Sequence, residues 1–327
     1  MPSIFVIIGL LGILGNGIVI FTIAQRLRLK SSNSRVPDIF FINSSAVDLM
    51  FLLGMPFVIP QLLGHRGWHF GHLMCVVISV MGSNTHFASA YILTAMAIDH
   101  YLAIVHPLAS TRLRKPTTAL LTICLLWVLS SLSITPMWMY TSLIQLPGGI
   151  SSCVIRLPNP DTDIYWFTLY QFVLAFAVPL TVISTAYRRI LFKISSPGTL
   201  ISHRRARLRT KRVARITIAI CLAFFLCWAP FYLLQLAQLA QEQPTRPFYC
   251  AYIAVISLGY ASSCLNPFIY IALCDSFRKW FIVSVWPSAA GKGSNTVVAW
   301  LGKEAELDQH HGQQPGSQRA PQSARLN

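Results

Sequence analysis

Seven long stretches of mostly apolar residues constrain the fold of this 327-residue chain more than any other feature. Their centres lie near Gly15, Leu52, Ala90, Leu126, Ala175, Phe224 and Ser257. A spanning helix needs roughly 20 apolar residues to cross a bilayer. Because lipid offers backbone amides no partner, each stretch must be helical, and all are too long and too uniformly apolar for barrel strands. The sequence therefore predicts an all-α membrane protein, a seven-transmembrane-helix bundle.

The composition agrees, since 54% of the residues are hydrophobic and 11% are charged, whereas about one quarter of a soluble domain is charged. We expect a first helix ending near Arg26 and others over about 38–63, 72–105, 117–140, 164–193, 210–241 and 248–273. Residues 1–273 thus form one transmembrane domain. Alternating cationic and aromatic residues predict a short amphipathic helix over 274–286, lying along the inner leaflet. The remainder, 287–327, reads as a disordered cytoplasmic tail.

The basic residues are distributed unevenly between the loops, and this predicts the orientation. All but three of the 26 Lys and Arg residues follow the first, third, fifth or seventh helix. Since positive loops stay in the cytoplasm, we expect a multi-pass plasma-membrane protein with its N-terminus outside and its C-terminus inside. The same rule accounts for the basic run Arg204 to Arg215, which we therefore do not assign to nucleic acid. Because only Met1 to Ser3 precede the first span, we expect a truncated or alternative start.

Two of the eight cysteines are expected to form a disulfide. Cys75 starts the third helix at its outer end, and Cys153 lies in the loop after the fourth helix, so both face the oxidising side. Cys250 lies near the same face and could compete. The other cysteines fall in spans or on the reducing side.

Ionisable residues inside a span mark functional sites, because an ionised side chain at the bilayer centre costs at least about 2.5 kcal/mol. Asp48 is such a residue, midway along the second helix; a neutral structural carboxyl is the alternative interpretation. Asp99 and His100 follow Cys75 by about 24 residues, which is about 36 Å of helix. They therefore belong to the cytoplasmic surface.

The order of distinctive residues along the spans is more specific than any one of them. From the first helix to the seventh, it runs Asn16, Asp48, Asp99, His100, Tyr101, Trp127, Pro179, Cys227, Trp228, Ala229, Pro230, Asn266, Pro267, Phe268, Ile269 and Tyr270. This set resembles the signature of rhodopsin-like G-protein-coupled receptors and touches essentially every span. The resemblance implies a receptor, not an enzyme, with a heterotrimeric G protein of the inhibitory class as its partner.

Further segments refine the resemblance. Residues 156–163, Arg-Leu-Pro-Asn-Pro-Asp-Thr-Asp, look like the second outer loop of melanin-concentrating hormone receptors, and 209–212 and 264–267 are similar too. Somatostatin receptors are the next most similar family and also bind cationic peptides. The resemblance thus implies a peptide hormone similar to melanin-concentrating hormone as the ligand.

The resemblance also implies roles for individual residues. An allosteric sodium ion would lie among Asp48, Ser89 and Asn266, and no other metal or cofactor is expected. The expected activation switch comprises Phe224, Trp228, Pro230, Asn266, Pro267 and Tyr270, while Asp99, His100 and Tyr101 face the G protein. The ligand pocket is expected near Gly82, Gln171, Trp228, Gln235 and Tyr260. Glutamine and tyrosine at such places also serve interhelical hydrogen bonding, which is the alternative.

Two residues of the third helix depart from the family pattern. Gly82 occupies the place of an aspartate that pairs with a basic residue of the peptide in both families. His100 occupies the place of an arginine that docks into the G protein, and imidazole lacks the five-donor fork of arginine. We therefore expect weak or altered recognition of melanin-concentrating hormone and altered coupling.

Other classes of membrane protein fit the sequence less well. Transporters and channels usually show internal repeats, paired broken helices or rings of charge, and none is visible. The sequence has neither the His-Glu-x-x-His nor the Gly-x-Ser-x-Gly motif of membrane or soluble hydrolases. A receptor that binds its ligand without signalling, or binds a different ligand, is the serious alternative, because of Gly82 and His100.

Overall fold

The computed structural model describes residues 2–28, 35–63, 67–146, 149–195, 204–240 and 246–273. The helices are α1 (Pro2–Arg28), α2 (Arg35–Leu62), α3 (Gly71–Val105), α4 (Pro107–Leu113), α5 (Pro116–Ser133), α6 (Thr135–Tyr140), α7 (Pro160–Phe172), α8 (Val178–Ser195), α9 (Arg204–Gln238) and α10 (Arg246–Leu273). A π-helical segment, η1 (Val173–Ala177), joins α7 to α8, and the strands are β1 (Thr141–Leu146) and β2 (Ile150–Ile155). Seven of these helical stretches are long and apolar enough to cross a membrane.

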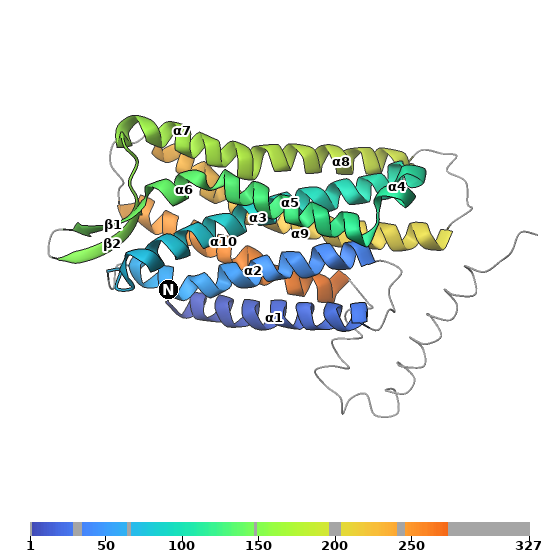
Figure 1. Ribbon diagram of the computed structural model, residues 1–327, viewed down its shortest axis with the longest axis horizontal. Helices are drawn as coiled ribbons and strands as arrows, with labels where there is room; N and C mark the ends of the chain where they lie inside the picture. Colours follow the sequence, from blue (N-terminus) through green and yellow to red (C-terminus); the bar gives the residue numbers. More distant parts are fainter. Residues whose placement is uncertain are drawn as a thin grey trace, which may run out of the picture.

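The long helices lie side by side along the longest axis of the molecule (Figure 1). The hairpin of β1 and β2 lies at one end of the bundle, and α4 lies at the other. The predicted seven-helix bundle is therefore confirmed, with helix ends that differ from the prediction by a few residues. The predictions for 274–286 and 287–327 lie outside the described residues.

The fourth span is shorter than predicted, because α5 ends at Ser133 and a separate helix, α6, begins at Thr135. Pro136 lies at the start of α6. Proline has no amide hydrogen and clashes with the preceding turn, so it is favoured in the first turn of a helix and weakens a helix interior. The break at Ile134 redirects the chain towards the hairpin.

The hairpin was not predicted. Its strands pair antiparallel from Thr141 with Ile155 to Leu146 with Ile150. Gly149 has a φ of +76°, a left-handed conformation that glycine adopts without steric cost. Two six-residue strands between long apolar spans give a weak sequence signal. Their pairing also depends on where α6 and α3 end, which the sequence does not specify.

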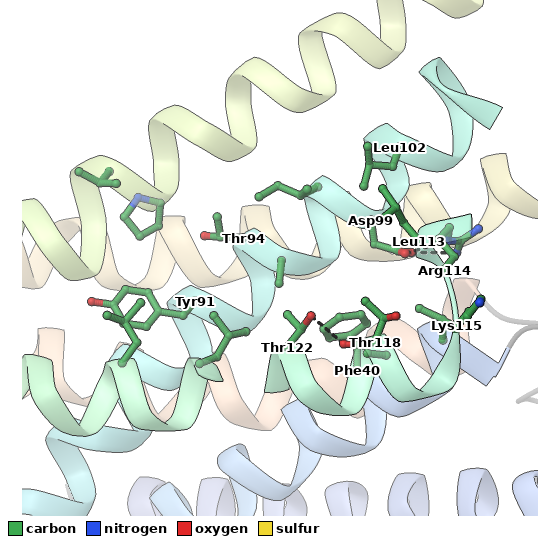
Figure 2. A pocket seen from close by; sticks show the side chains of 18 residues that line it. Phe40, Tyr91, Thr94, Asp99, Leu102, Leu113, Arg114, Lys115, Thr118 and Thr122 are labelled. Carbon is green, nitrogen blue, oxygen red and sulfur yellow. Dashed lines mark hydrogen bonds and ion pairs between the residues drawn. The ribbon is translucent and has the colours of Figure 1, made fainter. Parts of the chain in front are cut away.

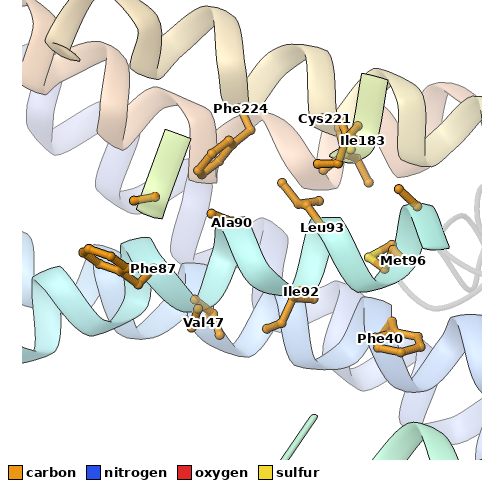
Figure 3. Close-up of a cluster of buried hydrophobic side chains, with 14 of the residues drawn as sticks. Phe40, Val47, Phe87, Ala90, Ile92, Leu93, Met96, Ile183, Cys221 and Phe224 are labelled. Atoms are coloured by element: carbon orange, nitrogen blue, oxygen red, sulfur yellow. The ribbon is translucent and has the colours of Figure 1, made fainter. Parts of the chain in front are cut away.

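The main apolar core surrounds the middle of α3 (Figure 3). Leu93 and Met96 of α3 are each 2% exposed, and Phe224 of α9 and Val47 of α2 pack into the same cluster. Other large apolar side chains point outwards, such as Leu226, which is 71% exposed. An apolar surface of this kind suits a lipid environment, so the bundle buries its core while the outside meets the bilayer.

Candidate functional site

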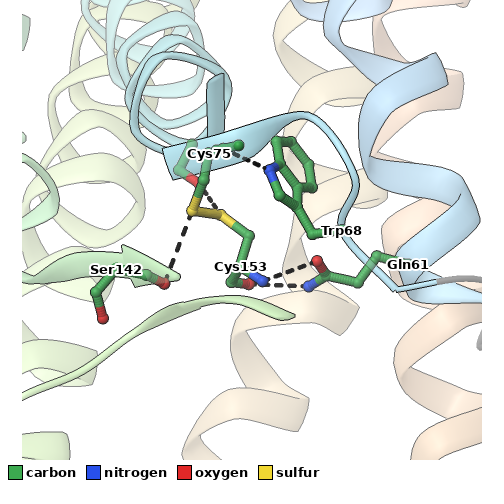
Figure 4. The surroundings of a disulfide bond; sticks show 7 residues. Gln61, Trp68, Cys75, Ser142 and Cys153 are labelled. Carbon is green, nitrogen blue, oxygen red and sulfur yellow. Dashed lines mark hydrogen bonds between the residues drawn. A yellow bond between two sulfur atoms is a disulfide. The ribbon is translucent and has the colours of Figure 1, made fainter. Parts of the chain in front are cut away.

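The hairpin covers one end of the bundle and is tied to α3 by a disulfide between Cys75 and Cys153, which confirms the predicted pair (Figure 4). The two Cα atoms are 5.6 Å apart. The Gln61 side chain of α2 donates to the Cys153 carbonyl at 2.8 Å and accepts from its amide at 3.0 Å. Cys250, the competing candidate, is free and exposed. The hairpin is therefore held to both α2 and α3.

Gly82 lies on α3 two turns below the disulfide. A Cβ atom built on Gly82 would meet no heavy atom within 4 Å, apart from the helix's own backbone. Residues four apart on a helix share a face, so the side chain of His86 lies one turn further along on the same face. The place where related receptors are expected to carry an aspartate is thus open space above a histidine.

His86 is the centre of an aromatic cluster. Its Nε2 atom and the Tyr232 hydroxyl are 2.7 Å apart and share a hydrogen bond. Its ring centroid is 3.9 Å from that of Trp228, and the ring stacks on Phe224 at 5.7 Å. Within the described part of the chain, the buried Nδ1 atom of His86 has no hydrogen-bond partner. The base of the site is therefore aromatic, and the Nδ1 atom of His86 remains without a hydrogen-bond partner among the described residues.

Neither His86 nor Tyr232 was among the predicted pocket residues. The signal for His86 was present in the sequence, since an ionisable residue inside a span is a candidate functional residue. The signal for Tyr232 was not, because a tyrosine in an apolar span is common and only packing brings it to His86.

The other predicted pocket residues take different positions. Gln171 of α7 donates weakly to the Met137 sulfur at 4.0 Å, and the buried Oε1 atom of Gln235 on α9 has no partner among the described residues. Tyr260 of α10 stacks on Phe51 of α2 with ring centroids 4.6 Å apart. Phe51 connects Tyr260 to Trp228, because its ring centroid is 6.0 Å from that of Trp228.

A polar cluster surrounds Asp48 inside the bundle. Its Oδ2 atom accepts a hydrogen bond from Asn266 of α10 at 2.6 Å, and the Ser263 side chain also bonds to this carboxyl. Asn16 of α1 donates to the Ser263 carbonyl at 3.0 Å. Ser89, a predicted member, makes no hydrogen bond to Asp48 within the described residues. The structure thus brings together Asp48 and Asn266 and adds Ser263 and Asn16.

The residues of the expected switch lie along α9 and α10. A Cβ at Gly259 would be 3.0 Å from the Trp228 ring, so α10 approaches Trp228 closely. Both α9 and α10 continue as helices through Pro230 and Pro267. Tyr270 is 3% exposed and packs edge-on against Phe41 of α2 at 5.0 Å. Asn266 belongs to this stretch and to the Asp48 cluster, and so connects the two.

At the far end of α3, Asp99 forms a bidentate ion pair with Arg114, with distances of 2.7 and 2.8 Å. The adjacent His100 is 2% exposed, and its Nδ1 atom lies 3.5 Å from the Tyr187 hydroxyl of α8. Tyr101 bonds instead to His106 at 3.1 Å. Arg114 was counted among the basic loop residues, but its pairing with Asp99 depends on how α4 folds the loop back.

The fold and this arrangement define a seven-transmembrane receptor. The family model described as 7 transmembrane receptor (rhodopsin family) matches residues 15–270, so the chain belongs to this family, whose members are receptors and not enzymes.

Among its relatives, the melanin-concentrating hormone receptor 1 of Homo sapiens is 60% identical over 292 residues, which cover 89% of this chain and 82% of that one. The receptor of the same name from Sus scrofa is 61% identical with the same coverage. The somatostatin receptor type 2 of Mus musculus is 34% identical over 284 residues, covering 86% and 75%. The predicted resemblances are therefore confirmed, and the chain is a multi-pass membrane protein.

Proposed function

We propose that this chain is a receptor for a peptide similar to melanin-concentrating hormone and passes the signal to a heterotrimeric G protein of the inhibitory class. The observation that carries the proposal is the 60% identity, over 89% of the chain, to a melanin-concentrating hormone receptor 1. The aromatic and polar cluster below the disulfide-bound hairpin supports it, because it offers a peptide both apolar contact area and hydrogen-bonding atoms.

The proposed ligand pocket lies between α3, α7, α9 and α10, at the end that carries the hairpin. With Gly82 in place of an acidic anchor, recognition of the peptide would rest on neutral groups. His86 Nδ1 and Gln235 Oε1 are buried and have no partner within the described residues, so a ligand group that reaches them can form a hydrogen bond with them. Neutral acceptors hold a cationic group less strongly than a desolvated carboxylate does, so we propose a weaker or shifted peptide preference.

The charges and the disulfide support a particular orientation in the membrane. We propose that the hairpin end faces outwards, with the N-terminus, and that the α4 end faces the cytoplasm of a cell-surface receptor. The disulfide supports this, because disulfides persist on the oxidising side of a membrane. Arg112, Arg114 and Lys115 lie at the opposite end, which agrees with the bias of basic residues towards cytoplasmic loops. Asp99, His100 and Tyr101 would then meet the G protein.

We further propose a sodium site at Asp48. The carboxylate, the Ser263 hydroxyl and the side-chain oxygen of Asn16 offer oxygen atoms inside the bundle, and the Asn16 oxygen is buried without a partner among the described residues. A buried anion next to oxygen donors suits a small hard cation. If so, raising sodium at constant ionic strength lowers agonist affinity, and Asp48→Asn removes this dependence; an equal response of both forms to sodium would contradict the site.

The test of the ligand assignment is G-protein activation by melanin-concentrating hormone in cells that express the native chain, Gly82→Asp or Gly82→Asn at equal surface levels. The asparagine variant is the control for shape, because it matches aspartate in size but carries no charge. We expect a weak response from the native chain and from Gly82→Asn. We expect a left-shifted dose-response curve for Gly82→Asp, since the aspartate restores a charge partner for the peptide.

The outcomes separate the candidate functions. Radioligand binding without activation, in all three forms, would favour the non-signalling receptor. A failure of all three forms to bind the hormone would reject it as the ligand and leave the receptor class standing.

A further inference from the structure

A long groove runs along the bundle surface between α3, α5 and α8, away from the proposed ligand pocket (Figure 2). Its volume is about 500 Å³. Tyr91 lies at one end and Leu102 lies near the other, where Arg114 and Lys115 are found. At 1.5 Å per residue, the lining stretch of α3 is about 16 Å long, which is close to half of a hydrocarbon core of about 30 Å. The groove thus has the depth of one leaflet.

The groove opens to the outside of the bundle. Several of its apolar lining residues are themselves exposed, including Ile98 at 41%, Leu129 at 49% and Val178 at 49%. These residues belong to helical stretches long and apolar enough to cross a membrane. The space is therefore accessible from the lipid.

Cationic groups lie at one mouth of the groove. The Arg114 guanidinium uses Nε and one terminal nitrogen to bind Asp99, and the other terminal nitrogen points away from Asp99 (Figure 2). Arginine has five donors, so this free edge can still bind a phosphate. Lys115 is exposed and forms no ion pair within the described part of the chain.

The one acid among the described lining residues is Asp99, and both its oxygens accept hydrogen bonds from Arg114. The mouth therefore carries net positive charge, next to a groove whose lining is otherwise mostly apolar. The combination matches an amphiphile with an anionic head.

We propose that this groove is a binding site for one anionic phospholipid of the inner leaflet. One acyl chain occupies the groove between Tyr91 and Leu102, and the headgroup phosphate binds the free edge of Arg114 and the ammonium of Lys115. Because Arg114 also holds Asp99, a bound lipid fixes the loop next to His100. Lipid binding is thereby connected to the surface that would meet the G protein.

The test is native mass spectrometry of the full-length chain purified in detergent and titrated with dioleoyl phosphatidylserine or dioleoyl phosphatidylcholine. We expect one phosphatidylserine retained more tightly than any phosphatidylcholine. Lys115→Gln should weaken that binding about fivefold, since one basic residue near an anionic headgroup contributes about 1 kcal/mol. Lys193→Gln removes a charge from the end of α8 but does not line the groove, so it should leave the binding unchanged.

A second pair of variants tests the acyl chain. Thr122→Trp, or Ala95→Phe where the first does not fold, fills the groove and should abolish the tight site. Leu125→Trp places the same side chain on the outer face of α5, where Leu125 is 68% exposed, and should have no effect. Equal binding of both lipids, equal loss in Lys115→Gln and Lys193→Gln, or full binding by the groove-filling variant would each overturn the proposal.

Discussion

The two positions of α3 at which we expect departures from the family pattern differ in their packing. Towards the hairpin end, a Cβ atom at Gly82 would meet no neighbour within 4 Å. Towards the α4 end, His100 is 2% exposed and lies next to Tyr187. One helix therefore carries an open position at one end and a closely packed histidine at the other.

This difference shows why a missing functional group is not the same as a lost site. At Gly82 the surrounding residues leave open space, so a Cβ atom fits there without displacing a neighbour. At His100 the neighbours are arranged around imidazole, and Asp99, the residue before it, pairs with Arg114. Gly82→Asp should therefore be nearly neutral for folding, whereas His100→Arg must displace existing contacts.

The largest effect on stability is expected at the disulfide that joins the hairpin to α3. Cys75→Ser should lower the free energy of unfolding by about 2–5 kcal/mol, the usual cost of removing a native disulfide, because the hairpin loses its covalent link to α3. The measurement is thermal unfolding of the purified chain, with Cys250→Ser as the control at a free, exposed cysteine. An equal effect of the two substitutions would show that the disulfide does not stabilise the hairpin end of the bundle.

The next largest effect on stability is expected at the ion pair near the α4 end of α3. Arg114→Gln should destabilise the chain by about 2–3 kcal/mol, because it leaves the carboxylate of Asp99 buried and unpaired; a fully buried pair would cost about 3–5 kcal/mol, but the Arg114 side chain is 24% exposed. The Asp99→Asn and Arg114→Gln double variant should recover part of this loss in the same assay. Strict additivity of the two single substitutions would mean that the pair does not couple.

A smaller effect is expected for His100→Arg. Arginine is longer than histidine at a site that is 2% exposed, so we expect a cost of about 1–2 kcal/mol from overpacking, together with stronger G-protein activation. The measurements are thermal unfolding and nucleotide exchange on the G protein, with His72→Arg, at the exposed start of α3, as the control. Unchanged nucleotide exchange would show that His100 does not limit coupling.

The smallest effect on stability is expected at Gly82. Gly82→Ala should change the free energy of unfolding by less than about 1 kcal/mol, because the site is open and alanine favours a helix over glycine. Gly15→Ala is the matched comparison, since its Cβ would lie 2.8 Å from the Pro267 ring and should separate α1 from α10. If Gly82→Ala proves as costly as Gly15→Ala, the space at Gly82 is not open and the contrast between the two ends of α3 fails.

Much of the site was predictable because spacing along a helix is preserved in space. Cys75, Gly82 and His100 follow one another on α3, so their order along the membrane normal follows from 1.5 Å per residue. The side of the membrane favoured Cys75 and Cys153 as a pair but left Cys250 as a competitor, which the structure shows to be free. The partners of His86 could not be predicted, because Tyr232 and Trp228 reach it from another helix whose rotation the sequence does not specify.

The sequence by itself determined the membrane class, the seven spans and the family, because the hydrophobic run length and the ordered polar positions are local properties of the chain. Only the tertiary structure decided that Gly82 faces open space, that Asp99 pairs with Arg114 and that a groove lies between α3, α5 and α8. These features depend on how helices rotate and cross, which is governed by contacts between residues far apart in the sequence, such as Asp48 with Asn266. A periodic apolar pattern constrains that packing without specifying which side chains meet.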